Sequence, residues 1–105
     1  MSENKTFGEL IQGNTPVLVD FSAAWCGPCK MMTPVLKELK GMVGDTALII
    51  KIDVDKNPGT AAAYKIQGVP TLMLFRKGKM MWRRSGVVGA KELKSEIDKL
   101  LQAAA

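Results

Sequence analysis

The segment Trp25-Cys26-Gly27-Pro28-Cys29-Lys30 follows the apolar run Val17-Leu18-Val19-Asp20-Phe21, and these two stretches together indicate the fold. The apolar residues of 17–21 do not alternate with polar ones, which is typical of a strand covered on both faces, as in a parallel sheet. A helix is predicted to start at the cysteine motif and to run to about Val43, because apolar residues recur there at helical spacing. The motif is therefore expected at the junction between a buried strand and a long helix.

The rest of the chain alternates helices and strands. Further strands are expected at 48–52, 71–75 and about 80–84, a hairpin turn at 76–79, and helices at 6–12, 60–64 and 90–101. The 48–52 run is continuously apolar apart from Lys51, so this strand is also expected to be buried. Strands that alternate with helices indicate right-handed crossovers and helices on both faces of one sheet. The order predicts a single α/β domain over residues 1–105, with an antiparallel pair at its edge.

The cysteine count limits the possible chemistry. The chain has 105 residues, two cysteines and no histidine. A structural zinc site usually needs four Cys or His ligands, and a cysteine protease needs a base, most often His, beside its thiol. Residues 1–6 lack the apolar stretch of a secretory signal, so we expect a cytoplasmic protein, where a purely structural disulfide is unusual. Redox exchange between the two cysteines and a partner remains.

The spacing of the two cysteines predicts their roles. Thiol–disulfide exchange needs an ionised thiol and a second thiol close enough to release the product. Cys26 is expected at the exposed start of the helix, where backbone N–H groups and the helix dipole favour negative charge, so it is predicted to attack. Cys29 lies one turn deeper and is predicted to resolve. Pro28 suits an early helical position, and Trp25 is expected to shield the pair and offer a flat contact surface.

These motifs resemble the thioredoxin family. The resemblance runs from about Pro16 to the end of the chain and rests on the strand 17–21, the cysteine motif and Gly68-Val69-Pro70-Thr71, among other positions. It implies a thioredoxin-like fold and a protein-disulfide reductase that binds no cofactor and receives electrons from NADPH through a flavin thioredoxin reductase. The implied partners are that reductase and disulfide-containing client proteins. We expect a monomer that binds neither nucleic acid nor a membrane.

Two features depart from the family pattern. Family members usually have a strand before the first helix, but here a helix is expected from about Thr6, which leaves no room for that strand. We therefore expect a central mixed sheet of about four strands, flanked by helices on both faces. Ser22 stands where many relatives have a large aromatic residue, which is expected to alter the packing behind the cysteines.

The residues alone leave two alternatives for Asp20 and Lys51, each of which interrupts an apolar strand. In one, Asp20 is buried with a raised pKa and takes the proton from Cys29, with Lys51 as its modulating partner. In the other, both side chains point to solvent at strand ends. The resemblance to thioredoxins favours the first alternative.

The resemblance also implies a substrate-binding groove around the cysteines. The Val69–Pro70 bond is implied to be cis and to face the cysteine pair, with the residue before the proline hydrogen-bonded to the substrate backbone. Gly27 and Pro28 are implied to belong to the same surface, together with Trp25. Gly86 would flank the groove, where a side chain would obstruct a partner. The alternative for Gly86 is an ordinary turn glycine.

The net charge of +5 arises from one segment. Residues 76–84 contain no acidic residue and five basic ones, namely Arg76, Lys77, Lys79, Arg83 and Arg84. Such a segment could bind nucleic acid or an acidic partner. It could also be a solvated hairpin whose cations protect an edge strand, and this second interpretation is favoured.

Three functional hypotheses are compatible with the sequence. The first is the reductase described above. The second is an oxidase or isomerase on the same scaffold, which Gly27-Pro28 and the absence of a signal peptide disfavour. The third is a redox-indifferent binding module, which would keep its function without Cys26 and Cys29.

Overall fold

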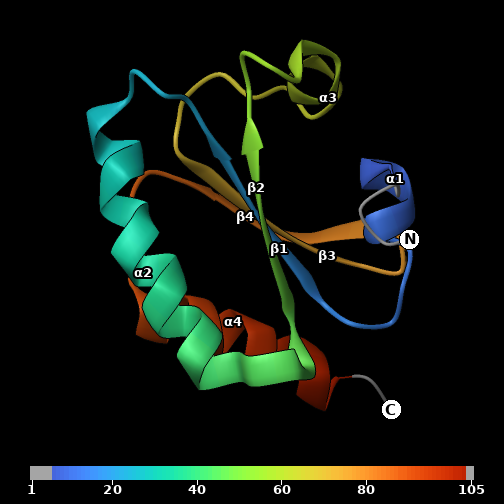
Figure 1. The fold of residues 1–105 in the computed structure, drawn as a ribbon. Coiled ribbons are helices and arrows are strands. Elements are labelled where there is room, and N and C mark those ends of the chain that lie inside the picture. The colour runs from blue at the N-terminus through green and yellow to red at the C-terminus, as the bar shows by residue number, and fades with distance from the viewer. Residues whose placement is uncertain (1–5, 104–105) are drawn as a thin grey trace.

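A computed structural model describes residues 6–103 and contains a four-stranded sheet between two layers of helices (Figure 1). Residues 1–5 and 104–105 of the expected domain lie outside the described residues. The elements in chain order are α1 Phe7–Leu10, β1 Val17–Ser22, α2 Gly27–Val43, a 3₁₀ turn Gly44–Thr46, β2 Leu48–Asp53, α3 Pro58–Ala63, β3 Thr71–Arg76, β4 Lys79–Ser85 and α4 Ala90–Gln102. The predicted order of helices and strands is confirmed, with differences only at the element ends.

The strands lie in the order β2-β1-β3-β4. Strand β1 pairs with β2 in parallel and with β3 in antiparallel, and β3 pairs with β4 in antiparallel. Because a parallel pair needs a crossover, α2 carries the chain from the end of β1 back to the start of β2. The carboxyl ends of β1 and β2 therefore meet at one edge of the sheet. The expected mixed sheet of four strands is confirmed for residues 6–103.

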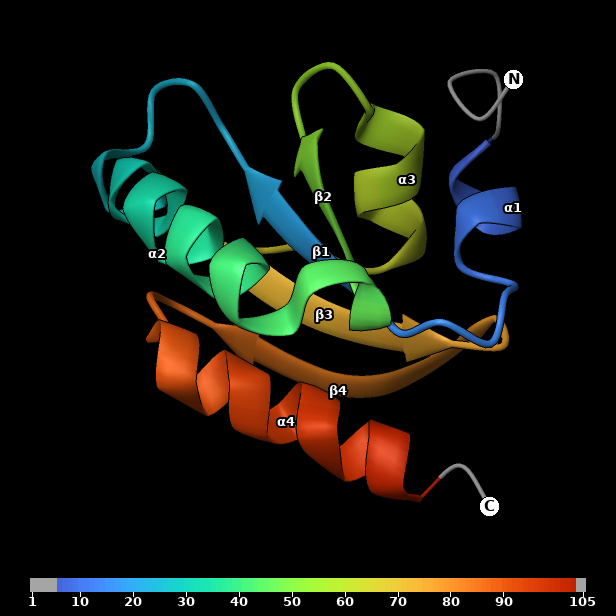
Figure 2. The same ribbon diagram turned by 60° about the horizontal axis from the view of Figure 1, so that its bottom comes forward.

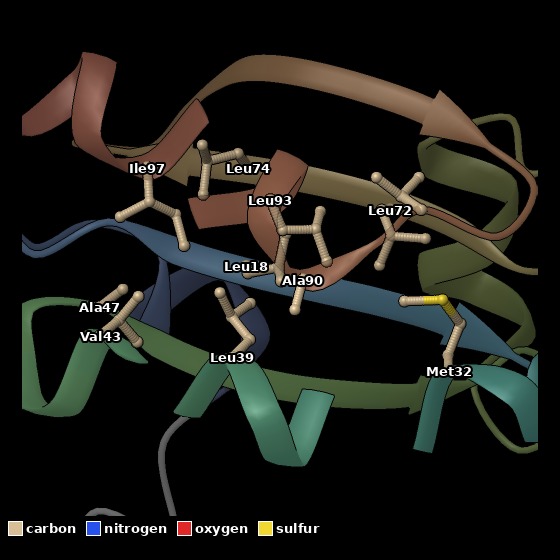
Figure 3. Packing of buried hydrophobic residues seen from close by; sticks show 11 residues of the cluster. Leu18, Met32, Leu39, Val43, Ala47, Leu72, Leu74, Ala90, Leu93 and Ile97 are labelled. Carbon is tan, nitrogen blue, oxygen red and sulfur yellow. The ribbon is translucent and has the colours of Figure 1, made fainter. Parts of the chain in front are cut away.

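One face of the sheet is covered by α2 and α4 (Figure 2). Leucines of the two central strands meet apolar side chains of both helices (Figure 3), among them Leu18, Leu72, Leu74, Leu39, Leu93 and Ile97. Each such side chain stabilises the fold by about 1.5–3 kcal/mol when fully buried. This layer holds α2 against the sheet and so positions the start of the helix, where the cysteines lie.

The other face is covered by α1 and the α3 region. Helix α1 has four residues, too few to be stable alone. Thr6 and Glu9 form a capping box at its start, and the Phe7 ring packs against Phe21, Tyr64 and Phe75 at centroid distances of 5.5–6.3 Å. Tertiary packing therefore stabilises this short helix.

The prediction that residues 48–52 form a buried strand is wrong in its burial, although the strand exists. Strand β2 lies at the edge of the sheet and pairs only with β1 in the described chain. Leu48 is 38% exposed and Lys51 is also exposed, whereas β1 is buried along its whole length. An apolar run indicates the covered faces of a strand, but its position in the sheet depends on which strands lie beside it.

The hairpin between β3 and β4 turns at Lys77 and Gly78, which have φ values of 54° and 79°. Two central residues with positive φ match the right-handed twist of the flanking strands. The N–H of Gly78 donates to the Ile11 carbonyl at 2.8 Å. A Cβ atom on Gly78 would lie 2.8 Å from the Gln12 side chain, so a glycine suits both the backbone and the close approach.

Three of the five cations in the basic segment bind groups of this chain. Arg76 donates to the carbonyls of Asn14 and Leu100, both at 2.7 Å. Arg84 forms an ion pair with Glu92, and Arg83 binds backbone carbonyls described below. These contacts favour a structural role for the hairpin cations. Within the described residues, no helix is long and apolar enough to cross a bilayer.

Candidate active site

The two cysteines lie at the start of α2 and form a disulfide, with a Cα–Cα distance of 5.3 Å. Cys26 is the N-cap residue, and its Sγ accepts a hydrogen bond from the Cys29 N–H at 3.1 Å. Gly27 and Pro28 occupy the first two helical positions, where the missing N–H of proline removes no helical bond. An N–H group and the positive end of the helix dipole thus face Cys26 Sγ, an environment that favours the thiolate after reduction.

Both cysteines are almost completely covered in this disulfide form. Cys26 is 4% exposed and Cys29 is 2% exposed, so the start of the helix, which was expected to be exposed at Cys26, is covered in the disulfide form. The pair packs against Ala23, Val54 and Val69. Val54 and Val69 come from distant parts of the chain, so the spacing of the two cysteines does not predict this burial.

The segment before β3 lies against the cysteine pair. The Val69–Pro70 bond is cis, and the Val69 carbonyl oxygen lies 3.5 Å from Cys26 Sγ. Both features agree with what the family resemblance implies. The N–H of Gly86 donates to the Pro70 carbonyl at 2.8 Å.

Gly86 has a φ of +97°, in the region that side chains disfavour. A Cβ atom there would meet no atom of residues 6–103 within 4 Å. The backbone conformation therefore explains the glycine in the isolated chain, and crowding within the chain does not.

Asp20 is completely buried, and neither of its carboxylate oxygens has a hydrogen-bond partner within residues 6–103. Burial raises its pKa from 3.8 to about 6, while the positive charge of Lys51 lowers it to a smaller extent. Asp20 and Lys51 are opposite each other in the β1–β2 register. The alternative in which both side chains point to solvent is therefore wrong for Asp20, whereas Lys51 is exposed.

A cleft of about 400 Å³ opens beside the disulfide. Its walls include Cys29 from α2, Ser22 from the end of β1, and Lys51 and Asp53 from β2. The small Ser22 side chain leaves room here that a large aromatic side chain would partly fill. The cleft thus brings the predicted resolving cysteine and the exposed lysine to one place beside the disulfide.

Proteins similar to this chain identify its family. Residues 1–99 match the thioredoxin family model. The chain belongs to the thioredoxin family. It is 43% identical to a thioredoxin of Alicyclobacillus acidocaldarius, over 91% of each chain. It is 42% identical to the chloroplastic thioredoxin Y2 of Arabidopsis thaliana, over 92% of this chain and 59% of that protein.

The fold is also that of solved thioredoxins. The crystal structure of oxidised mitochondrial thioredoxin 3 from Saccharomyces cerevisiae has a TM-score of 0.79 and 34% identity, and the match covers 89% of this chain and 86% of that one. Together with the Cys26–Cys29 pair, this membership makes the chain a thiol–disulfide oxidoreductase. Among the residues that the structure describes, no group of three or more His, Cys, Asp or Glu side chains could hold a metal ion.

In this thioredoxin-family chain, sequence reasoning missed the role of Asp55. The indole Nε1 of Trp25 donates to Asp55 Oδ2 at 2.8 Å, and Trp25 as a residue is 72% exposed. Asp53 Oδ1 accepts from the N–H groups of Asp55 and Lys56 at 2.8 and 3.1 Å, which stabilises the turn that presents Asp55. The sequence contained a signal for this contact, because Trp25 and Asp55 each follow one of two adjacent parallel strands, and such residues meet at the same edge of a sheet.

We expect Asp55→Ala to raise KM for a protein client about three- to tenfold with little change in kcat, because the Trp25 ring loses a hydrogen bond to a charged acceptor. The measurement is client turnover, combined with fluorescence anisotropy of Trp25 in a Trp82→Phe background. Asp55→Asn, which retains a side-chain oxygen, is the matched control. An Ala variant with wild-type KM and wild-type anisotropy would show that the bond does not orient the ring for binding.

Proposed function

We propose that this protein reduces disulfides in client proteins, with Cys26 as the nucleophile and Cys29 as the resolving thiol. The observation that carries the proposal is the hydrogen bond from the Cys29 N–H to Cys26 Sγ at the N-cap of a 17-residue helix. This environment stabilises negative charge on Cys26. A thiolate is the attacking species in exchange, so the assignment of roles follows from the position of each sulfur atom.

The exchange would proceed in two balanced steps. The Cys26 thiolate attacks one sulfur of the client disulfide, which forms a mixed disulfide and releases the other client sulfur as a thiolate. The Cys29 thiolate then attacks Cys26 Sγ, which forms the Cys26–Cys29 disulfide and releases the second client thiolate. Two electrons pass to the client, and the protein ends in the disulfide form that the structure shows.

The second step requires Cys29 to lose its proton, and we infer that Asp20 accepts it. A buried carboxylate with a pKa of about 6, and with no hydrogen-bond partner among the described residues, is a suitable base near neutral pH. Lys51 would modulate this base, because its charge lowers the pKa of Asp20. Asp20 and Lys51 would act on the resolving step, in which the client leaves.

We further propose that clients bind around the disulfide, on the surface formed by Trp25, Gly27, Pro28 and the Val69–Pro70 segment. The exposed Trp25 ring and the Val69 carbonyl near Cys26 support this placement. Gly86 would form the far side of the groove. A client lying there in an extended conformation could pair its main chain with Val69.

The remaining parts of the proposal concern the cellular context. The protein would act as a cytoplasmic monomer of one domain over residues 1–105, with no bound cofactor, nucleic acid or membrane. A flavin thioredoxin reductase would return the disulfide to the dithiol with electrons from NADPH. Membership of the thioredoxin family supports a reductase as a partner, while other relatives are chloroplastic or mitochondrial.

The test is NADPH-coupled reduction of a disulfide-containing test protein with a bacterial thioredoxin reductase. We expect NADPH consumption that depends on this protein and on the test protein. The Cys26→Ser/Cys29→Ser double variant is the control, and it should support no turnover. No NADPH consumption with the wild-type protein, although dithiothreitol reduces its disulfide readily, would contradict the proposed partner.

A further inference from the structure

The loop that carries Val69 is tied to the edge strand β4. This loop spans residues 64–70, between the end of α3 and the start of β3. Arg83 of β4 reaches back to it, because its Nη1 donates to the Tyr64 carbonyl at 2.7 Å and its Nη2 donates to the Lys65 carbonyl at 3.0 Å. The planar fork of the guanidinium group suits two adjacent acceptors.

Those two carbonyls lie at the C-terminal end of α3, where a helix leaves carbonyl groups without helical donors and carries partial negative charge. Lys65 has a φ of 54°, a conformation that residues other than glycine adopt at a cost. The guanidinium group therefore supplies donors and positive charge at the place where the chain leaves the helix in a disfavoured conformation. It holds the first residues of the loop.

The other end of the loop is held by Thr71, the first residue of β3, and by Gly86, the residue after β4. Thr71 Oγ1 donates to the Gly68 carbonyl at 2.6 Å and lies 3.1 Å from Ser85 Oγ. Gly86 follows β4 and donates its N–H to the Pro70 carbonyl. Val69 lies between these two attachments, with its carbonyl 3.5 Å from Cys26 Sγ.

We propose that Arg83 is a positioning residue for client binding, since it fixes the loop whose Val69 backbone faces the nucleophile. This inference rests on the proposed function and adds a residue outside the groove to it. Arg83 binds Tyr64 and Lys65 rather than either cysteine, so it would act on the affinity for extended protein clients. A small aromatic disulfide needs no pairing with the Val69 backbone, so a variant without the Arg83 guanidinium group would reduce it at the wild-type rate.

The test compares Arg83→Gln with wild type on two substrates. We expect KM for a protein client to rise about five- to tenfold, as for the loss of hydrogen bonds made by a charged donor, while kcat stays within about twofold. The rate with a small aromatic disulfide should also stay within about twofold. Hydrogen exchange of the backbone amides in residues 65–69 should become faster in the variant. Denaturant unfolding of both proteins measures the global stability and so separates a local change in the loop from general destabilisation.

Arg84 offers a matched control for the loss of charge. Adjacent strand residues point to opposite faces, and Arg84 instead pairs with Glu92 and lies 5.4 Å from the Trp82 ring centroid. Arg84→Gln should leave KM for the protein client within about twofold of wild type. Arg83→Lys keeps the charge but lacks the fork, so its KM should lie between those of wild type and Arg83→Gln.

The outcomes separate this inference from the proposed function. If wild type does not reduce the protein client, the proposed function fails. If wild type turns over the client and Arg83→Gln has the same KM, only the positioning role fails. An equal rise of KM in Arg84→Gln would assign the effect to net charge, and a parallel loss of kcat, small-disulfide rate and global stability would assign it to general destabilisation. Either result would overturn the positioning role.

Discussion

We expect Cys26→Ser to lose protein-disulfide reduction by about 10³-fold or more, because a hydroxyl group does not replace a thiolate as the attacking nucleophile. Cys29→Ser should behave differently. Its Cys26 can still attack, but no second thiol remains to release the client, so covalent adducts should accumulate. The two variants differ because of the positions of the two sulfur atoms. Cys26 is the N-cap residue, and its Sγ accepts a hydrogen bond from the Cys29 N–H at 3.1 Å.

The measurement is mass spectrometry of each variant after incubation with a disulfide-containing client, with peptide mapping of the adduct. The double Ser variant is the control and should form none. Because Cys26 Sγ accepts a helix N–H and so favours the thiolate, we expect the adducts to map to Cys26. Adducts through Cys29 in Cys26→Ser, without adducts through Cys26 in Cys29→Ser, would invert the role assignment.

We expect Asp20→Asn to gain stability relative to wild type as the pH rises. The pKa of Asp20 is about 6 in the folded protein, against 3.8 for the carboxyl group without burial, so the folded state binds the proton more tightly than the unfolded state. This contribution to stability is fully present below about pH 4 and is lost as the pH rises through about 6. A difference of about two pKa units corresponds to a loss on the order of 3 kcal/mol, which the Asn variant should not suffer.

Urea unfolding at pH 4 and pH 8 tests this prediction for both proteins. The difference in unfolding free energy between variant and wild type should shift in favour of Asn by on the order of 3 kcal/mol from the lower to the higher pH. The comparison across pH matters more than either value alone, because the buried amide has its own cost of desolvation. Asp53→Asn is a matched control, since Asp53 is only partly buried in the same region.

The same variant should slow the resolving step. Removal of a positioned base typically costs about 10²–10⁴-fold, so the mixed disulfide with a client should live longer in Asp20→Asn than in wild type. Single-turnover measurements of adduct decay between pH 6 and pH 8 would show this. If the variant resolves at the wild-type rate and its stability does not change relative to wild type across pH, Asp20 does not carry the buried charge or the proton.

In the proposed mechanism, stability and function are opposed at Asp20. A buried carboxylate without a partner costs free energy at neutral pH, and an evolved protein retains such a group where the chemistry needs it. Lys51 reduces the cost, because its charge lowers the pKa of Asp20 from the opposite position of β2. This exposed lysine can do so without being buried itself.

Patterns in the local sequence were enough to predict the main secondary-structure elements and the redox pair. The apolar run at 17–21 and the helical spacing after it predicted β1 and α2 because both patterns depend on neighbours within one element. The cysteine motif between them predicted the redox pair and the place of Cys26 at the start of the helix, since the first turn of a helix is built from consecutive residues. The Gly-Pro pair inside the motif and the residues around it further indicated the family.

Only the tertiary structure decided which side chains are buried and which distant residues meet. The runs at 17–21 and 48–52 look alike. In the described part of the chain, however, β1 has a strand on each side and β2 has one, so Asp20 is buried and Lys51 is not. Asp55 meets Trp25 because two parallel strands end at the same edge. Arg83 meets the end of α3 because β4 returns beside β3 in antiparallel. Such contacts join residues far apart in the chain, and no local pattern encodes them, because they depend on how the strands are ordered in the sheet.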